Sequence, residues 1–187
     1  MKSSVLEGNH IVLGADGNLG PFWVRAIVQS GGKVWGLGLK ATSNLELKNL
    51  SLEFPGKLEV IDFDLNSQTA ASLAELLPGD FSGVVLNAGI DSLPGTGHSS
   101  IEEFSAEDWE ATFRVNVFGN INFLNYLLNS SKLSRASIVF IGSMYSLVSP
   151  PKDLYSHFNG GKGATKNPAY AASKAALASA VRQYGTN

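Results

Sequence analysis

The segment Gly14–Gly20, with the sequence GADGNLG, decides the fold of this protein. It follows a short apolar run, His10–Leu13, and leads into a helical pattern in which Pro21 is an early residue. Glycines spaced three apart between a strand and a helix let the backbone approach a pyrophosphate, which then sits on the helix N-terminus. The same residues also suit a plain strand-to-helix turn, because glycine is the usual residue of tight turns. Both interpretations predict a strand, a turn and a helix.

Short runs rich in Val and Ile, bounded by Gly, Asn or Asp, recur along the chain and are typical of buried parallel strands. Helical patterns lie between them, and this alternation predicts a parallel sheet covered on both faces, with right-handed crossovers. The predicted strands are His10–Leu13, Lys33–Leu37, Leu58–Phe63, Gly83–Leu86 and Ala136–Ile141. The predicted helices are the one that begins near Pro21, then Asn44–Phe54, Ser67–Leu77, Ser105–Asn129 and Pro168–Tyr184.

The longest predicted helix, Ser105–Asn129, carries two apolar stripes, whereas a helix lying on a sheet needs one. The second stripe predicts a further contact, with a partner chain or with more of this one. The first stripe is Trp109, Phe113, Val117, Leu124 and Leu128; the second is Ala111, Val115, Phe118 and Tyr126.

The composition bounds the function. With 187 residues, 44% hydrophobic and 16% charged, the chain is expected to form a single domain, residues 1–187. A net charge of −2 offers no basic excess to neutralise nucleic-acid phosphates. The absence of cysteine excludes disulfides and cysteine metal sites, and the sequence predicts no metal. No apolar run approaches the roughly 20 residues that span a bilayer, so we expect a soluble, cytoplasmic protein without a nucleic-acid or membrane partner.

Two further motifs carry chemistry. Asn87-Ala88-Gly89 follows the fourth predicted strand, at the edge where ligands of open α/β sheets bind, although such a tripeptide also forms plain turns. Tyr170 and Lys174 are four apart on a predicted helix and therefore share a face. A nearby ammonium favours the phenolate, so we expect it to lower the pKa of the tyrosine toward the range of an acid–base catalyst. By itself such a pair is usually a surface coincidence.

Two polar residues are weaker candidates. Ser143 follows the fifth predicted strand and would place a hydroxyl beside a substrate carbonyl, or it is an ordinary turn residue. Asn116 lies inside the long predicted helix, where it either bonds the backbone or helps to position Lys174.

Together and in this order, these motifs resemble the short-chain dehydrogenase/reductase family, from Asn9 to Gly185. The resemblance implies a Rossmann-type, doubly wound parallel sheet with strand order 3-2-1-4-5. It implies an NAD(P)-dependent oxidoreductase that moves hydride between nicotinamide and a small carbonyl or alcohol substrate, as a homodimer or homotetramer. The implied catalytic residues are Asn116, Ser143, Tyr170 and Lys174. The implied cofactor-binding residues are Gly14, Asp16, Gly17, Asn18, Leu19, Gly20, Gly38, Lys40, Asp64, Leu65, Asn87, Ala88, Gly89, Tyr170 and Lys174.

The cofactor residues depart from the family pattern. Leu13 stands where the family often has threonine, and Asn18 where the classical subgroup has its middle glycine. NAD users place an acid at the end of the second strand to bind the ribose 2′-hydroxyl, but here the chain reads Gly38-Leu39-Lys40. Lys40 or Ser43 suits a 2′-phosphate, which favours NADP slightly. Asp16 would repel that phosphate if it lies close.

The interval between Ser143 and Tyr170 is 27 positions, about twice the family's usual spacing, and the excess is the loop Ser149–Asn167. The loop is either solvated or a substrate-facing flap with cations for an acidic substrate. The resemblance implies a similar loop in relatives of acidic-sugar and flagellin-modification pathways. Its candidate residues are Lys152, Tyr155, His157, Lys162 and Lys166.

The resemblance also implies that the chain lacks the last strands of the full family fold, which shape the substrate pocket. We therefore expect a chain that self-associates through Ser105–Asn129 and Pro168–Tyr184 and binds dinucleotide, with weak or missing catalysis. The alternative is a dinucleotide-binding sensor or truncated pseudoenzyme without turnover.

Overall fold

The computed structural model describes residues 6–73, 75–91, 100–157 and 165–186. The chain divides into two compact units. Unit 1 comprises Met1–Ala88 and Gly119–Ile141, and unit 2 comprises Gly89–Phe118 and Gly142–Asn187. The expectation of a single domain stays a prediction.

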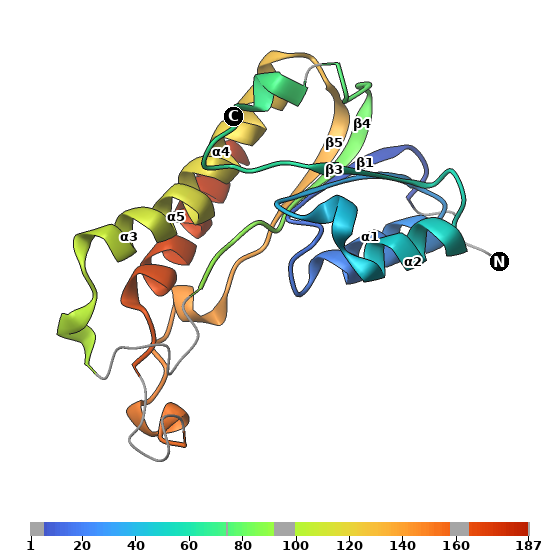
Figure 1. The fold of residues 1–187 in the computed structure, drawn as a ribbon. Coiled ribbons are helices and arrows are strands. Elements are labelled where there is room, and N and C mark those ends of the chain that lie inside the picture. The colour runs from blue at the N-terminus through green and yellow to red at the C-terminus, as the bar shows by residue number, and fades with distance from the viewer. Residues whose placement is uncertain (1–5, 74, 92–99, 158–164, 187) are drawn as a thin grey trace. The chain divides into compact units, whose positions relative to one another are not determined.

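Unit 1 contains a five-stranded, all-parallel sheet (Figure 1). The strand order β3-β2-β1-β4-β5 confirms the expected doubly wound arrangement. Each strand lies within a few residues of its predicted position. The bounds are β1 Asn9–Leu13, β2 Lys33–Gly38, β3 Leu58–Asp62, β4 Phe81–Leu86 and β5 Leu133–Phe140.

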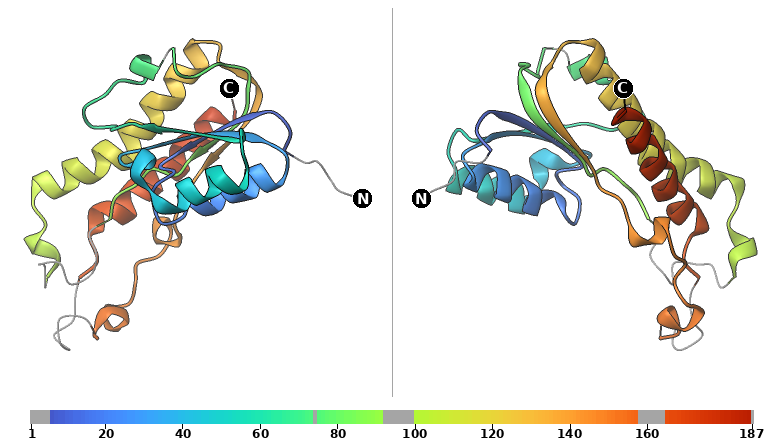
Figure 2. Two further views of the ribbon diagram at one scale, coloured as in Figure 1. Left: turned by 45° about the vertical axis from the view of Figure 1, so that its right-hand side comes forward. Right: turned by 180° about the vertical axis from the view of Figure 1, so that it is seen from behind.

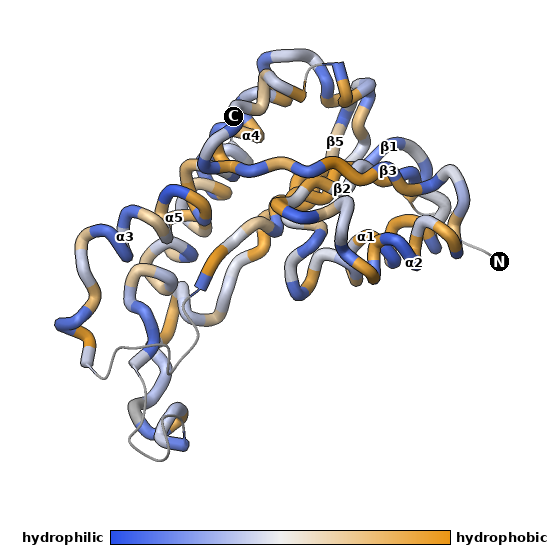
Figure 3. Tube along the Cα trace, viewed as in Figure 1, coloured by the Kyte–Doolittle hydropathy of each residue, from blue (hydrophilic) through white to orange (hydrophobic). Residues whose placement is uncertain are grey.

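Helices cover both faces of this sheet because buried apolar side chains lie on both sides of its strands. Figure 3 shows apolar residues along the strands. Val12 of β1 packs with Val24 of α1 (Gly20–Gln29) and with Leu47 of α2 (Leu45–Glu53), where the Asn44 side chain caps the helix. The neighbouring residues of β1 face the other way and pack with α4 (Asn120–Asn129). The predicted helix over Asn44–Phe54 is therefore confirmed.

The predicted helix Ser67–Leu77 is wrong. The described part of that range contains one short 3₁₀ turn, η2 (Ala70–Leu73). The Asp64 carboxylate accepts hydrogen bonds from the Asn66 N–H at 2.9 Å and the Ser67 hydroxyl at 2.8 Å, and the Gln68 side chain accepts one from the Asp64 N–H at 2.7 Å. Such local side-chain bonds compete with helix formation.

The predicted helix Ser105–Asn129 is present but irregular. It consists of α3 (Ala106–Phe113), a π-helical segment, η4 (Arg114–Gly119), and α4. Ser105 begins it with a reciprocal capping box to Asp108. Its two predicted apolar stripes do not correspond to two faces, since each mixes buried and exposed side chains: Leu124 is buried whereas Leu128 of the same stripe is exposed, and Val115 is buried whereas Phe118 is exposed. A π segment breaks the helical period on which those stripes were drawn.

Unit 2 contains α3 and α5 (Pro168–Tyr184), which lie side by side (Figure 2). The bounds of α5 match the prediction. Pro168 starts the helix and the Asn167 side chain caps it, accepting a hydrogen bond from the Ala169 N–H at 2.9 Å. Three 3₁₀ turns complete the unit: η3 (Ile101–Glu103), η5 (Met144–Ser146) and η6 (Lys152–Tyr155). None of the helices in the described residues has the length and hydropathy that a membrane span requires.

Candidate functional site

The glycine turn of unit 1 is held by the backbone. Gly14 has a φ of +80°, and a Cβ there would lie 2.7 Å from the backbone of Ala88. The N–H groups of Gly14 and Ala15 both donate to the Leu37 carbonyl, at 2.7 and 2.9 Å. A side chain on Gly20 would overlap the carbonyl of Ala15. Two of the three glycines are therefore required by the packing of the turn itself.

Gly17 differs from the other two glycines of the turn, Gly14 and Gly20. It is exposed, and a Cβ there would meet the Gly14 carbonyl at 3.3 Å and the Asn87 amide at 3.7 Å. The turn runs into α1, whose N-cap residue, Leu19, makes no side-chain cap. The dipole at a helix N-terminus favours an anion, and a phosphate group binds well there. The turn thus has the features of a phosphate site.

Asn87-Ala88 is tied to this turn inside unit 1. The Asn87 amide donates to the Gly14 carbonyl at 2.8 Å, and its backbone N–H donates to the Leu13 carbonyl at 2.9 Å. The fully buried Asn120 donates to the Ala88 carbonyl at 2.9 Å. Sequence reasoning missed Asn120, although its position four residues after Asn116 was a usable signal.

The end of β2 lies against the same turn. Asp16 reaches Gly38, where a Cβ would overlap its carboxylate, and its Oδ2 accepts a hydrogen bond from the Lys40 N–H at 2.6 Å. Asp16 therefore lies beside the end of β2. Asp64, one of the implied cofactor-binding residues, is bonded to Asn66 and Ser67, and these bonds hold the pKa of its carboxyl below the ordinary value. Leu65 packs against the core.

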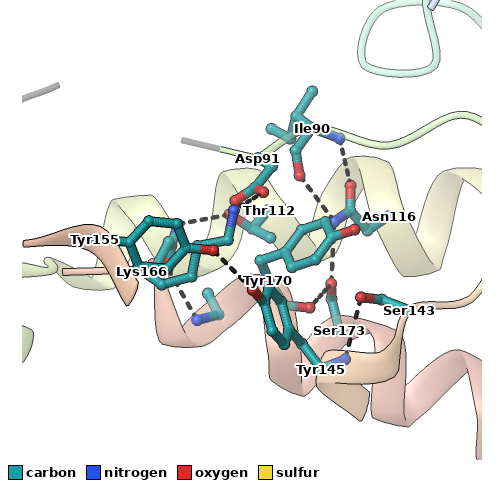
Figure 4. Close-up of polar contacts among 12 residues, drawn as sticks. Ile90, Asp91, Thr112, Asn116, Ser143, Tyr145, Tyr155, Lys166, Tyr170 and Ser173 are labelled. Atoms are coloured by element: carbon teal, nitrogen blue, oxygen red, sulfur yellow. Dashed lines mark hydrogen bonds and ion pairs between the residues drawn. The ribbon is translucent and has the colours of Figure 1, made fainter. Parts of the chain in front are cut away.

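The predicted catalytic residues all belong to unit 2. Asn116 is fully buried in the π segment; its Oδ1 accepts from the Ile90 N–H at 2.7 Å, and its Nδ2 donates to the Ile90 carbonyl at 3.0 Å (Figure 4). The same Nδ2 donates to the Ser173 hydroxyl at 3.0 Å, which in turn donates to the Tyr170 carbonyl at 2.7 Å. Asn116 thereby fixes the first turn of α5 to the segment that follows Gly89.

Lys174 is buried beside these groups. Its ammonium lies 5.7 Å from the centroid of the Tyr170 ring, and a Cβ on Gly89 would lie 3.5 Å from it. Burial lowers the pKa of the Lys174 ammonium, opposed by the negative charge of Asp91. The structure brings Tyr170 and Lys174 together, as their spacing predicted, and Asn116 bonds the backbone, as one of its two interpretations had it.

Burial raises the pKa of the Tyr170 hydroxyl above its ordinary value; a hydrogen bond with Ser143 opposes this, and Asp91 and Tyr145 add to it. This direction is opposite to the expected lowering by Lys174, because burial disfavours the phenolate and also weakens the hold of the lysine on its proton. Ser143 begins η5, where its hydroxyl accepts a hydrogen bond from the Tyr145 N–H at 3.2 Å.

The loop that precedes α5 contributes to the same cluster. Lys166 forms an ion pair with Asp91, its side chain is 12% exposed, and its ammonium lies 5.0 Å from the Tyr170 ring centroid. The Tyr155 hydroxyl is 2.8 Å from that of Tyr145, and burial with this bond raises the pKa of Tyr155 to about 12. The solvated-loop interpretation therefore does not hold for Lys166 and Tyr155.

Sequence reasoning missed Asp91 and Tyr145, each two positions after a residue that it had singled out. His157 is exposed, Lys162 lies outside the described residues, and the side chain of Lys152 is not described. Within the described ranges, no three His, Cys, Asp or Glu side chains form a group that suits a metal ion.

Comparisons with known proteins agree with this fold. The chain resembles a carbonyl reductase from Pseudomonas aeruginosa PAO1, solved in complex with NADP, at 24% identity and a TM-score of 0.75, over 95% of this chain and 75% of that chain. It resembles a short-chain dehydrogenase/reductase (glucose/ribitol dehydrogenase) from Brucella melitensis at 22% identity and a TM-score of 0.74, over 100% and 72%. It resembles a serine dehydrogenase from Escherichia coli at 23% identity and a TM-score of 0.66, over 90% of this chain and 70% of that chain. At these identities the likeness shows the fold.

No match was found among curated protein sequences. The family model of short chain dehydrogenases, in contrast, matches residues 9–186, nearly the whole chain. The chain therefore belongs to the short chain dehydrogenase family.

Proposed function

We propose that this protein is an NAD(P)-dependent oxidoreductase that interconverts a carbonyl and an alcohol on a small molecule. The observation that carries the proposal is the ordered cluster of unit 2, in which Tyr170 and Lys174 share a face of α5 and Asn116 holds the start of that helix through Ser173. Membership of the family supports the reaction class.

The residues of unit 1 suit the proposed dinucleotide. Gly17 is exposed where a side chain would stand over the turn, and the dipole at the N-terminus of α1 favours the pyrophosphate. A bound nicotinamide would supply or accept the hydride. Lys174 would hold the nicotinamide ribose hydroxyls with its ammonium, and Asn87 would maintain the turn by its bond to Gly14.

The chemistry at the substrate oxygen falls to unit 2. In the reducing direction Tyr170 donates its hydroxyl proton to the carbonyl oxygen, and Ser143 donates a hydrogen bond that polarises that oxygen. In the oxidising direction Tyr170 takes the proton back from the alcohol. Lys174 stabilises the phenolate whenever it is formed.

The nature of the substrate is constrained by the pairing of Lys166. An acidic substrate was one expectation for the loop cations, but Asp91 already neutralises Lys166 beside Tyr170. Tyr145 and Tyr155 add hydroxyls to the same cluster. A neutral substrate with hydroxyl groups therefore fits this cluster better than a carboxylate.

A second candidate is a dinucleotide-binding sensor without turnover. The raised pKa of Tyr170 favours it, because a phenol that resists ionisation is a weak acid–base catalyst at neutral pH. The sequence-based expectation that catalysis by this chain is weak or missing stays a prediction.

Two measurements on the purified chain separate these functions. Binding is followed by the fluorescence of NADH or NADPH. Turnover is followed by the loss of the near-ultraviolet absorbance of the reduced nicotinamide, over a panel of aldehydes, ketones and sugars. Binding with turnover supports the oxidoreductase, binding without turnover supports the sensor, and no binding contradicts both.

A further inference from the structure

The adenosine end of the proposed dinucleotide site lacks its usual acid. In α/β dinucleotide sites an Asp or Glu about 20 residues after the glycine turn accepts a hydrogen bond from the ribose 2′-hydroxyl. Here β2 ends at Gly38, and Leu39 and Lys40 follow. From the sequence alone, this end of the strand permits NADP.

The structure supplies a carboxylate at that position from another segment. Asp16 belongs to the glycine turn, yet its carboxylate occupies the space that a side chain on Gly38 would take. One oxygen, Oδ2, is held by the Lys40 N–H at 2.6 Å, and the Asn44 amide donates to the Asp16 carbonyl at 3.4 Å. Asp16 is thus fixed from both its side chain and its backbone, at the end of β2.

A second carboxylate strengthens the negative charge there. Asp62 of β3 is the register partner of Gly38. It accepts hydrogen bonds from the Thr42 N–H at 2.9 Å and the Thr42 hydroxyl at 2.6 Å, and these bonds hold its pKa below the ordinary value, so it stays ionised. A 2′-phosphate carries a charge of about −1.5 to −2 at neutral pH, and it would approach both carboxylates.

From this placement we infer that Asp16, rather than a residue of β2, binds the adenosine ribose and makes the protein prefer NAD over NADP. The inference rests on the proposed dinucleotide binding. The lone pairs left on the carboxylate accept the ribose hydroxyls, and the same charge repels a 2′-phosphate. Although the Pseudomonas carbonyl reductase was solved with NADP, its 24% identity carries over the fold and not this residue.

The test titrates the full chain with NADH and with NADPH and compares the two dissociation constants. We expect NADH to bind at least about tenfold more tightly, the effect of one charged hydrogen bond. Asp16→Asn keeps an acceptor for the Lys40 N–H and removes the charge, so this preference should fall about tenfold. The matched control is Asp80→Asn, the same change at an exposed residue before β4, at the opposite end of the strands.

A rescue variant separates charge from fold. The double variant Asp16→Gly/Gly38→Asp moves the acid onto β2, into space that Asp16 itself fills in the native chain. It should restore the preference for NADH that Asp16→Asn loses. A native preference for NADPH, an unchanged ratio in Asp16→Asn, or an equal loss of both nucleotides in that variant would overturn the inference and leave the proposed function standing. No binding of either nucleotide to the native chain would overturn both.

Discussion

The glycine turn of unit 1 and the tyrosine–lysine cluster of unit 2 are built in different ways. The turn is made by close backbone contacts, which require residues without a side chain: neither Gly14 nor Gly20 leaves room for a Cβ. The cluster is made by side chains that meet across a long separation in sequence, such as Asn116 and Ser173. The first should fail when atoms are added, and the second when atoms are removed.

The largest expected effect is on chemistry in unit 2. Tyr170→Phe removes one hydroxyl, the proposed proton donor, and kcat should fall by about 10²–10⁴, the usual contribution of general acid–base catalysis. Dinucleotide affinity and the melting temperature should stay near the native values, since the ring is kept. Steady-state reduction of the best carbonyl in the panel measures this.

The control is Tyr184→Phe, the same change at the exposed end of α5. Near-native kcat in Tyr170→Phe would remove Tyr170 from the mechanism.

Adding atoms to the turn should separate its glycines. Gly17→Val should abolish dinucleotide binding and cost less folding free energy than Gly20→Val, because Gly17 is exposed and a Cβ there would lie close to the Gly14 carbonyl, at 3.3 Å, without overlapping it. Gly20→Val should instead prevent stable folding, because its side chain would overlap the Ala15 carbonyl. Calorimetry and thermal unfolding measure the two effects. Native affinity in a folded Gly17→Val variant would mean that the cofactor does not lie on this turn.

Removing the buried amide should loosen unit 2. Asn116→Ala removes three hydrogen bonds, two to the backbone of Ile90 and one to Ser173, and each contributes about 0.5–1.5 kcal/mol net. We expect about 2–4 kcal/mol of lost stability, measured by urea unfolding. Ser173→Ala, which removes one smaller partner of the same network, should cost less; equal costs would show that the bonds to Ile90 contribute little.

The smallest expected effect is on pH dependence. Reduction needs protonated Tyr170, and burial raises the pKa of this hydroxyl, so the rate should persist above pH 10, about the ordinary value for tyrosine, and fall as the pH passes the raised pKa. Any stability linked to this group is likewise present at lower pH and is lost as the pH rises through that pKa.

Asp91→Asn should move the alkaline limb of the rate profile to lower pH, because it removes a negative charge that disfavours the phenolate. A limb that stays in place would mean that Asp91 does not act on Tyr170.

The comparison also shows what sequence reasoning can reach. The strands were predicted within a few residues because alternation of apolar runs and glycine turns is a local signal. The helix Ser67–Leu77 failed because Asp64, Ser67 and Gln68 bond one another instead of continuing a helical ladder. The π-helical segment η4 could not be predicted, because a prediction from apolar spacing assumes a regular α-helix.

The candidate site shows the same limit. The four implied catalytic residues were named from the resemblance to the family. The Asp91–Lys166 ion pair could not be predicted, because its members are 75 positions apart in the sequence. The direction of the Tyr170 pKa was also missed, because spacing reveals a neighbouring cation and says nothing about burial. The sequence indicated that Asp16 would repel a nearby 2′-phosphate of NADP, but only the structure shows that its carboxylate lies beside Gly38.

The π-helical segment η4 has a genetic consequence. Asn116 lies inside this segment and is bonded to Ile90, and Asn120, directly after it, is bonded to Ala88. A π turn holds more residues than an α turn, so loss of a single codon within Arg114–Gly119 would let the helix become regular while turning one of these amides away from its partner. We therefore expect this stretch to tolerate substitutions on its exposed side more readily than deletions. The helix would survive such a deletion, and the polar contacts on one side of it would not.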